Sequence, residues 1–223
     1  LRGGGVELSA GPVISLGRLG WQGAELALNA RLGAAMLDSA PYSRLWGLSS
    51  ALSFPLSAQT RARMTLDYQN EVHFGGVSAT QRDGDRVQAA IDLVHVLSPE
   101  WRLNGGVNLV RRVAAAGYNS YWETAAQIGV SHAYNGPFGS ADEPWVFSLA
   151  GRIAQRVNDV PDTMVNASTA QSGVELSINA TQSIPLSKGL DLSFTAGYRT
   201  IKSNYDTRSL QDASVGVSLT YSF

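Results

Sequence analysis

Polar and apolar residues alternate along almost the whole chain, in stretches of about 11 to 15 residues. The clearest stretch runs from Thr60 to Glu71. Its two faces carry Ala62, Met64, Leu66 and Tyr68 on one side and Arg61, Arg63, Thr65, Asp67, Gln69 and Glu71 on the other. A strand in a soluble sheet is most often about 5 or 6 residues long, whereas a membrane-spanning strand needs at least about 9 to 11. The length of these stretches favours a membrane β-barrel.

We count about eleven such strands and predict an all-β fold, an antiparallel transmembrane β-barrel of about twelve strands. Residues 1–223 are expected to form a single transmembrane domain, either a mature protein or the C-terminal part of a longer one. A closed single-chain barrel has an even number of strands, so an odd count means that a strand precedes Leu1 or that the count is wrong by one. The other stretches are Val6–Leu19, Ala24–Ala34, Leu45–Phe54, Val87–Leu93, the segment from Trp101, Trp122–Tyr134, Trp145–Asn158, Val174–Ile184, Leu190–Ile201 and Ala213–Phe223.

Alternation alone does not say which face points inward, because a soluble lipocalin-like barrel would place its apolar residues inside. Charges rarely interrupt the apolar face here, and the exceptions, Arg18 and Arg111, lie near strand ends where an arginine can reach the interface. Aromatic residues gather at the ends of that face, as in the girdles of membrane barrels. These residues are Trp101, Trp122, Tyr134, Trp145, Tyr198, Tyr221 and Phe223. We therefore expect the apolar face to contact lipid.

The composition excludes several classes of protein. The chain has no cysteine, which removes disulfide scaffolds and cysteine-based zinc or redox sites. A net charge of −1 argues against a nucleic-acid partner. The longest apolar runs fall far short of the roughly 18 residues that a membrane helix needs. Charged residues make up only 16% of the chain, below the roughly 25% of soluble domains, so little of the surface is expected to be ionic.

The charged residues predicted to face inward are the one group of residues that informs about function. They either create a field across a selective pore or pair with one another and fill a narrow lumen. Twelve strands about 4.8 Å apart and tilted by about 40° give a backbone diameter of roughly 24 Å, so a narrow passage is the most we expect. The predicted lumen residues are Arg61, Arg63, Asp67, Arg102, Arg112, Glu123, Arg152, Arg156, Glu175 and Arg199, with Glu25, Arg31, Glu71, Arg86, Asp92 and Asp191 at equivalent positions.

Nothing in the sequence predicts a catalytic, cofactor or metal site. The three histidines, His73, His95 and His132, are scattered and lack the spacing of metal ligands. Ser131 and His132 are neighbours in one strand and must point to opposite faces, so they cannot form a catalytic dyad. We therefore expect no enzymatic activity and no cofactor.

The connections between strands predict an orientation. Tight turns at Leu19–Gln22, Pro55–Gln59, Leu97–Glu100 and Pro185–Gly189 alternate with longer polar segments such as Met36–Ser43, Gly75–Gly84 and Asn158–Ala170. Outer-membrane barrels have short periplasmic turns and long outer loops. The predicted location is the bacterial outer membrane, with the C-terminus on the periplasmic side and with outer-membrane lipids and lipopolysaccharide as the surroundings.

The last strand, Ala213–Phe223, resembles the closing strand of bacterial outer-membrane barrels, which ends in an aromatic residue after alternating apolar positions. This resemblance implies that Tyr221 and Phe223 form the signal read by the barrel-assembly machinery. Glycine lies at Gly216, whereas the family's usual position is occupied here by Ser218. Ile184–Ser187, Tyr198 and Ser203–Asp206 also resemble the C-terminal barrels of tetratricopeptide-linked exporters and surface-lipoprotein assembly factors, which implies periplasmic or envelope protein partners.

The sequence favours four functions in the following order. The first is a channel, or the outer-membrane exit of an export system, with a narrow, arginine-rich, charge-paired lumen. The alternative is a structural or assembly anchor whose barrel is plugged. An outer-membrane enzyme and a soluble β-barrel binding protein come last.

Overall fold

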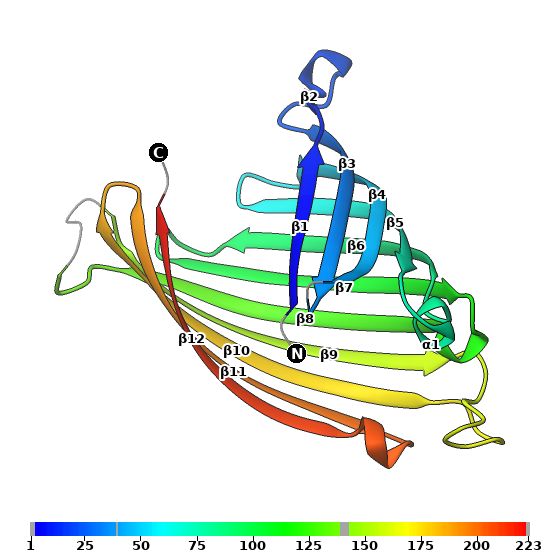
Figure 1. Ribbon diagram of the computed structural model, residues 1–223. Coiled ribbons are helices and arrows are strands. Elements are labelled where there is room, and N and C mark those ends of the chain that lie inside the picture. The colour runs from blue at the N-terminus through cyan, green and yellow to red at the C-terminus, as the bar shows by residue number, and fades with distance from the viewer. Residues whose placement is uncertain (1–2, 39, 139–142, 222–223) are drawn as a thin grey trace.

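The computed structural model describes residues 3–38, 40–138 and 143–221, and they form one antiparallel sheet (Figure 1). The sheet order is β1-β3-β4-β5-β6-β7-β8-β9-β10-β11-β12, and β2 also pairs with β3. The strands are β1 Gly3–Ala10, β2 Val13–Ser15, β3 Glu25–Leu37, β4 Ala40–Pro55, β5 Thr60–His73, β6 Gly84–Val96, β7 Trp101–Ala114, β8 Tyr121–Tyr134, β9 Trp145–Asn158, β10 Ser172–Ser187, β11 Leu190–Ser203 and β12 Leu210–Tyr221. All-β architecture is therefore confirmed. Among the described residues no helix is long and apolar enough to cross a bilayer.

The strand count also agrees with the sequence. β1 and β2 occupy a single strand position, because Ala10 lies opposite Ala30 and Val13 lies opposite Ala27 in one unbroken register. Pro12 interrupts the ladder because it has no N–H, although its carbonyl still accepts a hydrogen bond from Leu28 N at 3.0 Å. A Cβ built on Gly11 would lie 1.7 Å from the Leu28 carbonyl oxygen, so only glycine fits there. The irregular stretch Val6–Leu19 is thus one broken strand.

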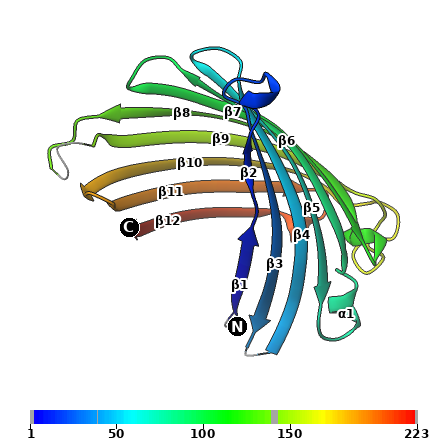
Figure 2. The same cartoon turned by 90° about the horizontal axis from the view of Figure 1, so that it is seen from above.

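The sheet is strongly curved, and its two edges are the outer strands β1 and β12. Figure 2 shows β1 to β4 running steeply across the direction of β8 to β12. Within the described part of the chain, β1 pairs only with β3 and β12 pairs only with β11. The path from β1 to β12 has eleven strand positions, the two edges included, and every neighbouring pair is antiparallel, so β1 and β12 run in the same direction.

One face of the sheet is polar and the other is apolar. Residues opposite each other on neighbouring strands point to the same face, so the register places Arg63, Gln88 and Arg152 together and Leu66, Leu149 and Leu219 on the reverse. Val110 of β7, Ala125 of β8 and Ala154 of β9, at 1%, 5% and 4% exposed, are buried positions on the polar face. Apolar-face residues such as Ile128 remain 70% exposed. Since curvature crowds side chains on the inner surface, the polar face is the concave one.

The connections gather at two ends of the sheet. We call the end with segments 74–83, 115–120, 159–171 and 204–209 the loop end, and the end with segments 56–59, 97–100, 135–144 and 188–189 the turn end. The loop end carries the short helix α1 (Val77–Thr80) and the single 3-10 turns η2 (Gly117–Asn119) and η3 (Asp206–Arg208), as Figure 1 shows. A third such turn, η1 (Gly17–Leu19), follows β2.

One predicted connection is wrong. Met36–Ser43 was expected to form a long polar loop, but β3 continues to Leu37 and β4 begins at Ala40. The strands extend further because Met36 and Pro41 still pair across a register shift, and Asp38 takes a left-handed backbone conformation with φ 48°. Asparagine and aspartate tolerate that conformation better than other non-glycine residues do.

Candidate functional site: the charged concave face

The strand register places all ten charged residues singled out in the sequence on the concave face. They are Arg61, Arg63 and Asp67 on β5, Arg102 and Arg112 on β7, Glu123 on β8, Arg152 and Arg156 on β9, Glu175 on β10, and Arg199 on β11. Strict alternation along each strand is sufficient to assign the face. Their role as the lining of a lumen stays a prediction.

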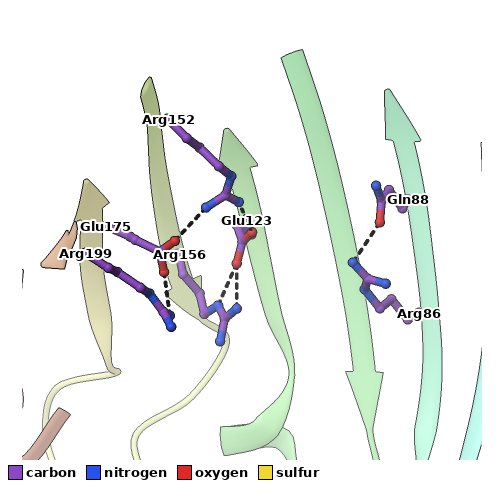
Figure 3. Close-up of polar contacts among 7 residues, drawn as sticks. All are labelled: Arg86, Gln88, Glu123, Arg152, Arg156, Glu175 and Arg199. Carbon is purple, nitrogen blue, oxygen red and sulfur yellow. Dashed lines mark hydrogen bonds and ion pairs between the residues drawn. The ribbon is translucent and has the colours of Figure 1, made fainter. Parts of the chain in front are cut away.

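Five of these residues form a continuous ladder of ion pairs across four strands. Arg152 lies between the two carboxylates, with Nη2 2.9 Å from Glu123 Oε1 and Nη1 2.8 Å from Glu175 Oε1 (Figure 3). Arg156 Nη2 donates to Glu123 Oε2 at 2.6 Å, and Arg199 Nη2 donates to Glu175 Oε2 at 2.7 Å. Each carboxylate therefore accepts from two guanidiniums, and this geometry is typical of strong charge-assisted hydrogen bonds.

The ladder borders a groove on the concave face. A hollow of about 440 Å³ runs beside Arg152, Arg156 and Arg199, and Asp212 of β12 also lines it. A second hollow of about 390 Å³ continues from Arg156 and Arg199 toward η3 at the loop end. The Glu123 side chain is only 13% exposed, so its charge depends on the two arginines for compensation.

Two smaller clusters lie nearer to the N-terminal strands. Arg31 of β3 contacts Asp67 of β5 with an Nη2–Oδ2 distance of 2.5 Å and lies 3.8 Å from Glu7 of β1. Arg112 of β7 lies 3.6 Å from Glu71 of β5, which is also 3.5 Å from His73 Nε2. The Arg31–Asp67 and Arg112–Glu71 contacts each join two strands that have another strand between them, so they link the sheet across its curvature as well as neutralising charge.

The arginines at the turn end have different surroundings. The Arg61 guanidinium donates to the Gly23 carbonyl at 2.8 Å. The guanidiniums of Arg63 and Arg102 have no hydrogen bond or ion pair with any described residue. Arg86, two residues after the start of β6 and so toward the loop end, donates to Gln88 Oε1 at 2.7 Å (Figure 3). The concave face thus has a charge-paired half and an arginine-rich half.

Two acidic residues of the concave face were missed in the sequence. Asp212 lies opposite Arg199, but the predicted strand began one residue later, at Ala213. Glu7 lies opposite Gly33, within the opening stretch whose alternation is irregular. Continuing the period of two by one step from Ser214 would have found Asp212. Glu7 had no comparable signal.

Aromatic residues on the convex face lie near both ends of the strands. At the turn end, the rings of Trp101 and His132 stack with centroids 4.1 Å apart, and Tyr134 and Trp145 follow at 6.1 Å. Toward the loop end, Trp46 contacts Tyr68 at 5.2 Å, and the Tyr68 hydroxyl donates to Asp85 at 2.7 Å. Such amphipathic rings suit the two boundaries of a bilayer.

Ser131 and His132 point to opposite faces, as expected. The Ser131 hydroxyl lies 3.0 Å from that of Ser148 on the concave side, whereas His132 stacks on Trp101 on the convex side. Within the ranges that the structure describes, no group of three or more candidate ligands could hold a metal ion. Of the predicted closing signal, Tyr221 ends β12 on the convex face and Phe223 lies outside the described residues.

Arg111, predicted as a charged exception on the apolar face, is neutralised at the loop end, and the register places Arg44, Asp85 and Lys202 on the same convex face. Its two Nη atoms each lie 2.6 Å from a carboxylate oxygen of Asp159, and the guanidinium lies 5.2 Å from the Trp122 ring centroid. The hydrogen bonds from Arg111 hold the pKa of Asp159 below its usual range. The pair attaches the start of the 159–171 segment to the sheet.

No protein-family model matches this chain, and no curated protein matches it by sequence. Solved structures do match. The siderophore receptor PirA from Pseudomonas aeruginosa aligns with 99% of this chain and 37% of its own, at TM-score 0.50 and 11% identity. OprD from Pseudomonas aeruginosa aligns with 89% of this chain and 60% of its own, at TM-score 0.50 and 14% identity.

The chain therefore spans less than two thirds of either protein's length. At such identities the likeness concerns the fold. The long antiparallel strands, the apolar convex face and these structural matches together show that the chain has the fold of a bacterial outer-membrane β-barrel.

Proposed function

We propose that the chain forms the wall of an outer-membrane channel and that its charged concave face lines a water-filled passage for polar solutes. The observation that carries this proposal is the ladder from Arg156 to Arg199, because such a row of charges is stable only where water or opposite charges surround it. The convex face supplies the complementary property, since Leu149 and Ile178 are exposed apolar residues suited to lipid.

The same ladder supports a selective passage. Its three guanidiniums and two carboxylates leave one positive charge in excess (3 − 2). Rows of opposed charge along a narrow path create a field that discriminates between solutes by sign and dipole. The resemblance to exporter barrels supports outward passage, with the chain acting as the outer-membrane exit of an export system. The turn end and the C-terminus would then face the periplasm.

We also propose that residues 1–223 are part of a larger barrel. β1 and β12 run in the same direction, so pairing them directly would create a parallel contact. Antiparallel closure requires an odd number of additional strands between them. Backbone groups left unpaired at an edge in hydrocarbon would cost several kcal/mol each, so the two edges must be covered in a membrane.

Conductance measurements on the purified barrel in planar bilayers test the channel function. We expect discrete steps whose reversal potential in a salt gradient shifts toward cation selectivity when Arg152→Gln and Arg156→Gln are combined. The control removes two positive charges from the convex face, Arg44→Gln with Lys202→Gln, and should leave selectivity unchanged. A difference in gel migration between unheated and heated samples would verify folding. A folded, inserted barrel that never conducts would overturn the channel in favour of the plugged anchor.

A further inference from the structure

Three arginines converge on one hollow at the turn end of the concave face. Arg61 and Arg63 of β5 and Arg102 of β7 line a hollow of about 510 Å³ beside the β4–β5 turn. On β6, which lies between these strands, Val94 is opposite Arg61 and Val96 is opposite Arg102. Neighbouring strands lie about 4.8 Å apart, so β5 and β7 bring their arginines within reach of one small ligand.

The positive charge of this hollow is not neutralised by the protein. Asp92 is the one carboxylate that lines it, which leaves an excess of two positive charges (3 − 1). Asp92 lies directly opposite Arg63 in the register, yet no ion pair joins them, and its Oδ1 accepts instead from Gln127 Nε2 at 3.1 Å. At the other end of the concave face, Arg152, Arg156 and Arg199 each contact a glutamate. Each arginine of the ladder therefore contacts a glutamate, whereas the three arginines of this hollow share one aspartate that pairs with none of them.

We propose that Arg61, Arg63 and Arg102 form a binding site for a small solute that carries a carboxylate or phosphate group. The planar guanidinium presents paired N–H donors that match the two oxygens of such an anion, and it is less strongly hydrated than an ammonium. Arg63 and Arg102 have all their donors free of described protein partners, so binding would break no existing ion pair. The hollow would act as a selective entry point at the turn-end mouth, which rests on the proposed channel function.

Ligand-observed nuclear magnetic resonance on the intact barrel in detergent tests the site without requiring conduction. Sodium acetate and inorganic phosphate, added separately, are the two probes, and either one binding supports the site while their comparison identifies the preferred group. We expect Arg63→Gln with Arg102→Gln to weaken binding by about tenfold or more, since two of three bidentate donors are lost. The convex-face control Arg44→Gln with Lys202→Gln should bind as the wild type does.

Two further variants separate loss of the site from loss of the fold. Asp92→Asn removes the only carboxylate of the hollow and should tighten binding of either probe severalfold, a gain that misfolding cannot produce. Arg63→Lys with Arg102→Lys keeps the positive charge but loses the paired N–H donors of the guanidinium, and should weaken binding by about threefold.

No binding by the wild type, or equal binding by the Arg63→Gln and Arg102→Gln variant, would overturn the site. Conductance without probe binding would remove this site and leave the channel. Probe binding that requires Arg63 and Arg102, in a barrel that never conducts, would support the binding site and contradict the channel function.

Discussion

Arg152 and Glu123 join β9 to β8 through an ion pair with an Nη2–Oε1 distance of 2.9 Å, on the crowded side of a curved sheet. The same guanidinium reaches Glu175 on β10, so a single side chain spans three strands. Neither carboxylate depends on Arg152 alone. Glu123 retains Arg156 and Glu175 retains Arg199 when Arg152 is removed, whereas Arg156 has no other acidic partner than Glu123 among the described residues.

Removing Glu123 should therefore cost more stability than removing Arg152. We expect Arg152→Gln to lower the free energy of unfolding by about 1 to 2 kcal/mol, and Glu123→Gln to lower it by more, because Arg156 then keeps no acidic partner among the described residues. Urea unfolding in detergent, followed by tryptophan fluorescence, measures both. Lys202→Gln on the convex face is the charge-matched control. The reverse order of the two effects would show that the ladder does not act as a connected unit.

The two faces of the sheet should differ in how well they tolerate an added arginine. Leu149→Arg puts a charge on the apolar convex face and should cost about 2 to 4 kcal/mol in a bilayer. Asn179→Arg, on the concave face of the neighbouring strand, should cost little because water can solvate it there. Refolding into lipid vesicles at graded urea concentrations compares the two. Similar losses for both variants would contradict the assignment of the faces.

Period-two alternation was sufficient to place Arg63, Arg152 and Glu123 on one face, because a side chain's face depends only on its position along its own strand. Which residues pair could not be deduced in this way. Arg152 lies opposite Gln127 and Ser177, yet it reaches the glutamates through diagonal contacts that depend on the register and on side-chain length. Arg63 shows the converse, since it lies opposite Asp92 and does not pair with it.

Low pH should release the segment that follows β9. The pKa of Asp159 is lowered in the fold by Arg111, so the contribution of this pair is complete above the ordinary aspartate pKa near 3.8 and is lost as the pH falls through the lowered value. We expect cleavage of segment 159–171 by pepsin, normalised to an unstructured peptide, to rise sharply below that pH. In Asp159→Asn the segment should be cleaved readily even at pH 4. A pH-independent wild type would show that Arg111 does not hold this segment.

The end of β12 should matter for assembly more than for the properties of the concave face. Tyr221 is 66% exposed on the convex face, and the alternation continues to Phe223. Deleting Phe223 should reduce the amount of heat-modifiable barrel in the outer membrane severalfold, because the assembly machinery would lose its aromatic signal. Barrels that do assemble should keep wild-type selectivity. Normal amounts of the truncated protein in cells would contradict the closing-strand interpretation.

The edges of the sheet give the last prediction, and the absence of cysteine from the chain makes it simple to test. If additional strands separate β1 from β12, cysteines at Ser9 and at Ser214 or Ser218 should not be joined by a short bis-maleimide in the assembled, membrane-embedded protein. A matched pair at Ala150 and Asn179, which lie opposite each other on β9 and β10, should be joined readily. Efficient cross-linking of Ser9 to either β12 position would mean that the barrel closes by a parallel contact between its own first and last strands. The passage would then be as narrow as eleven strand positions allow, roughly 22 Å between backbones before the arginines are counted.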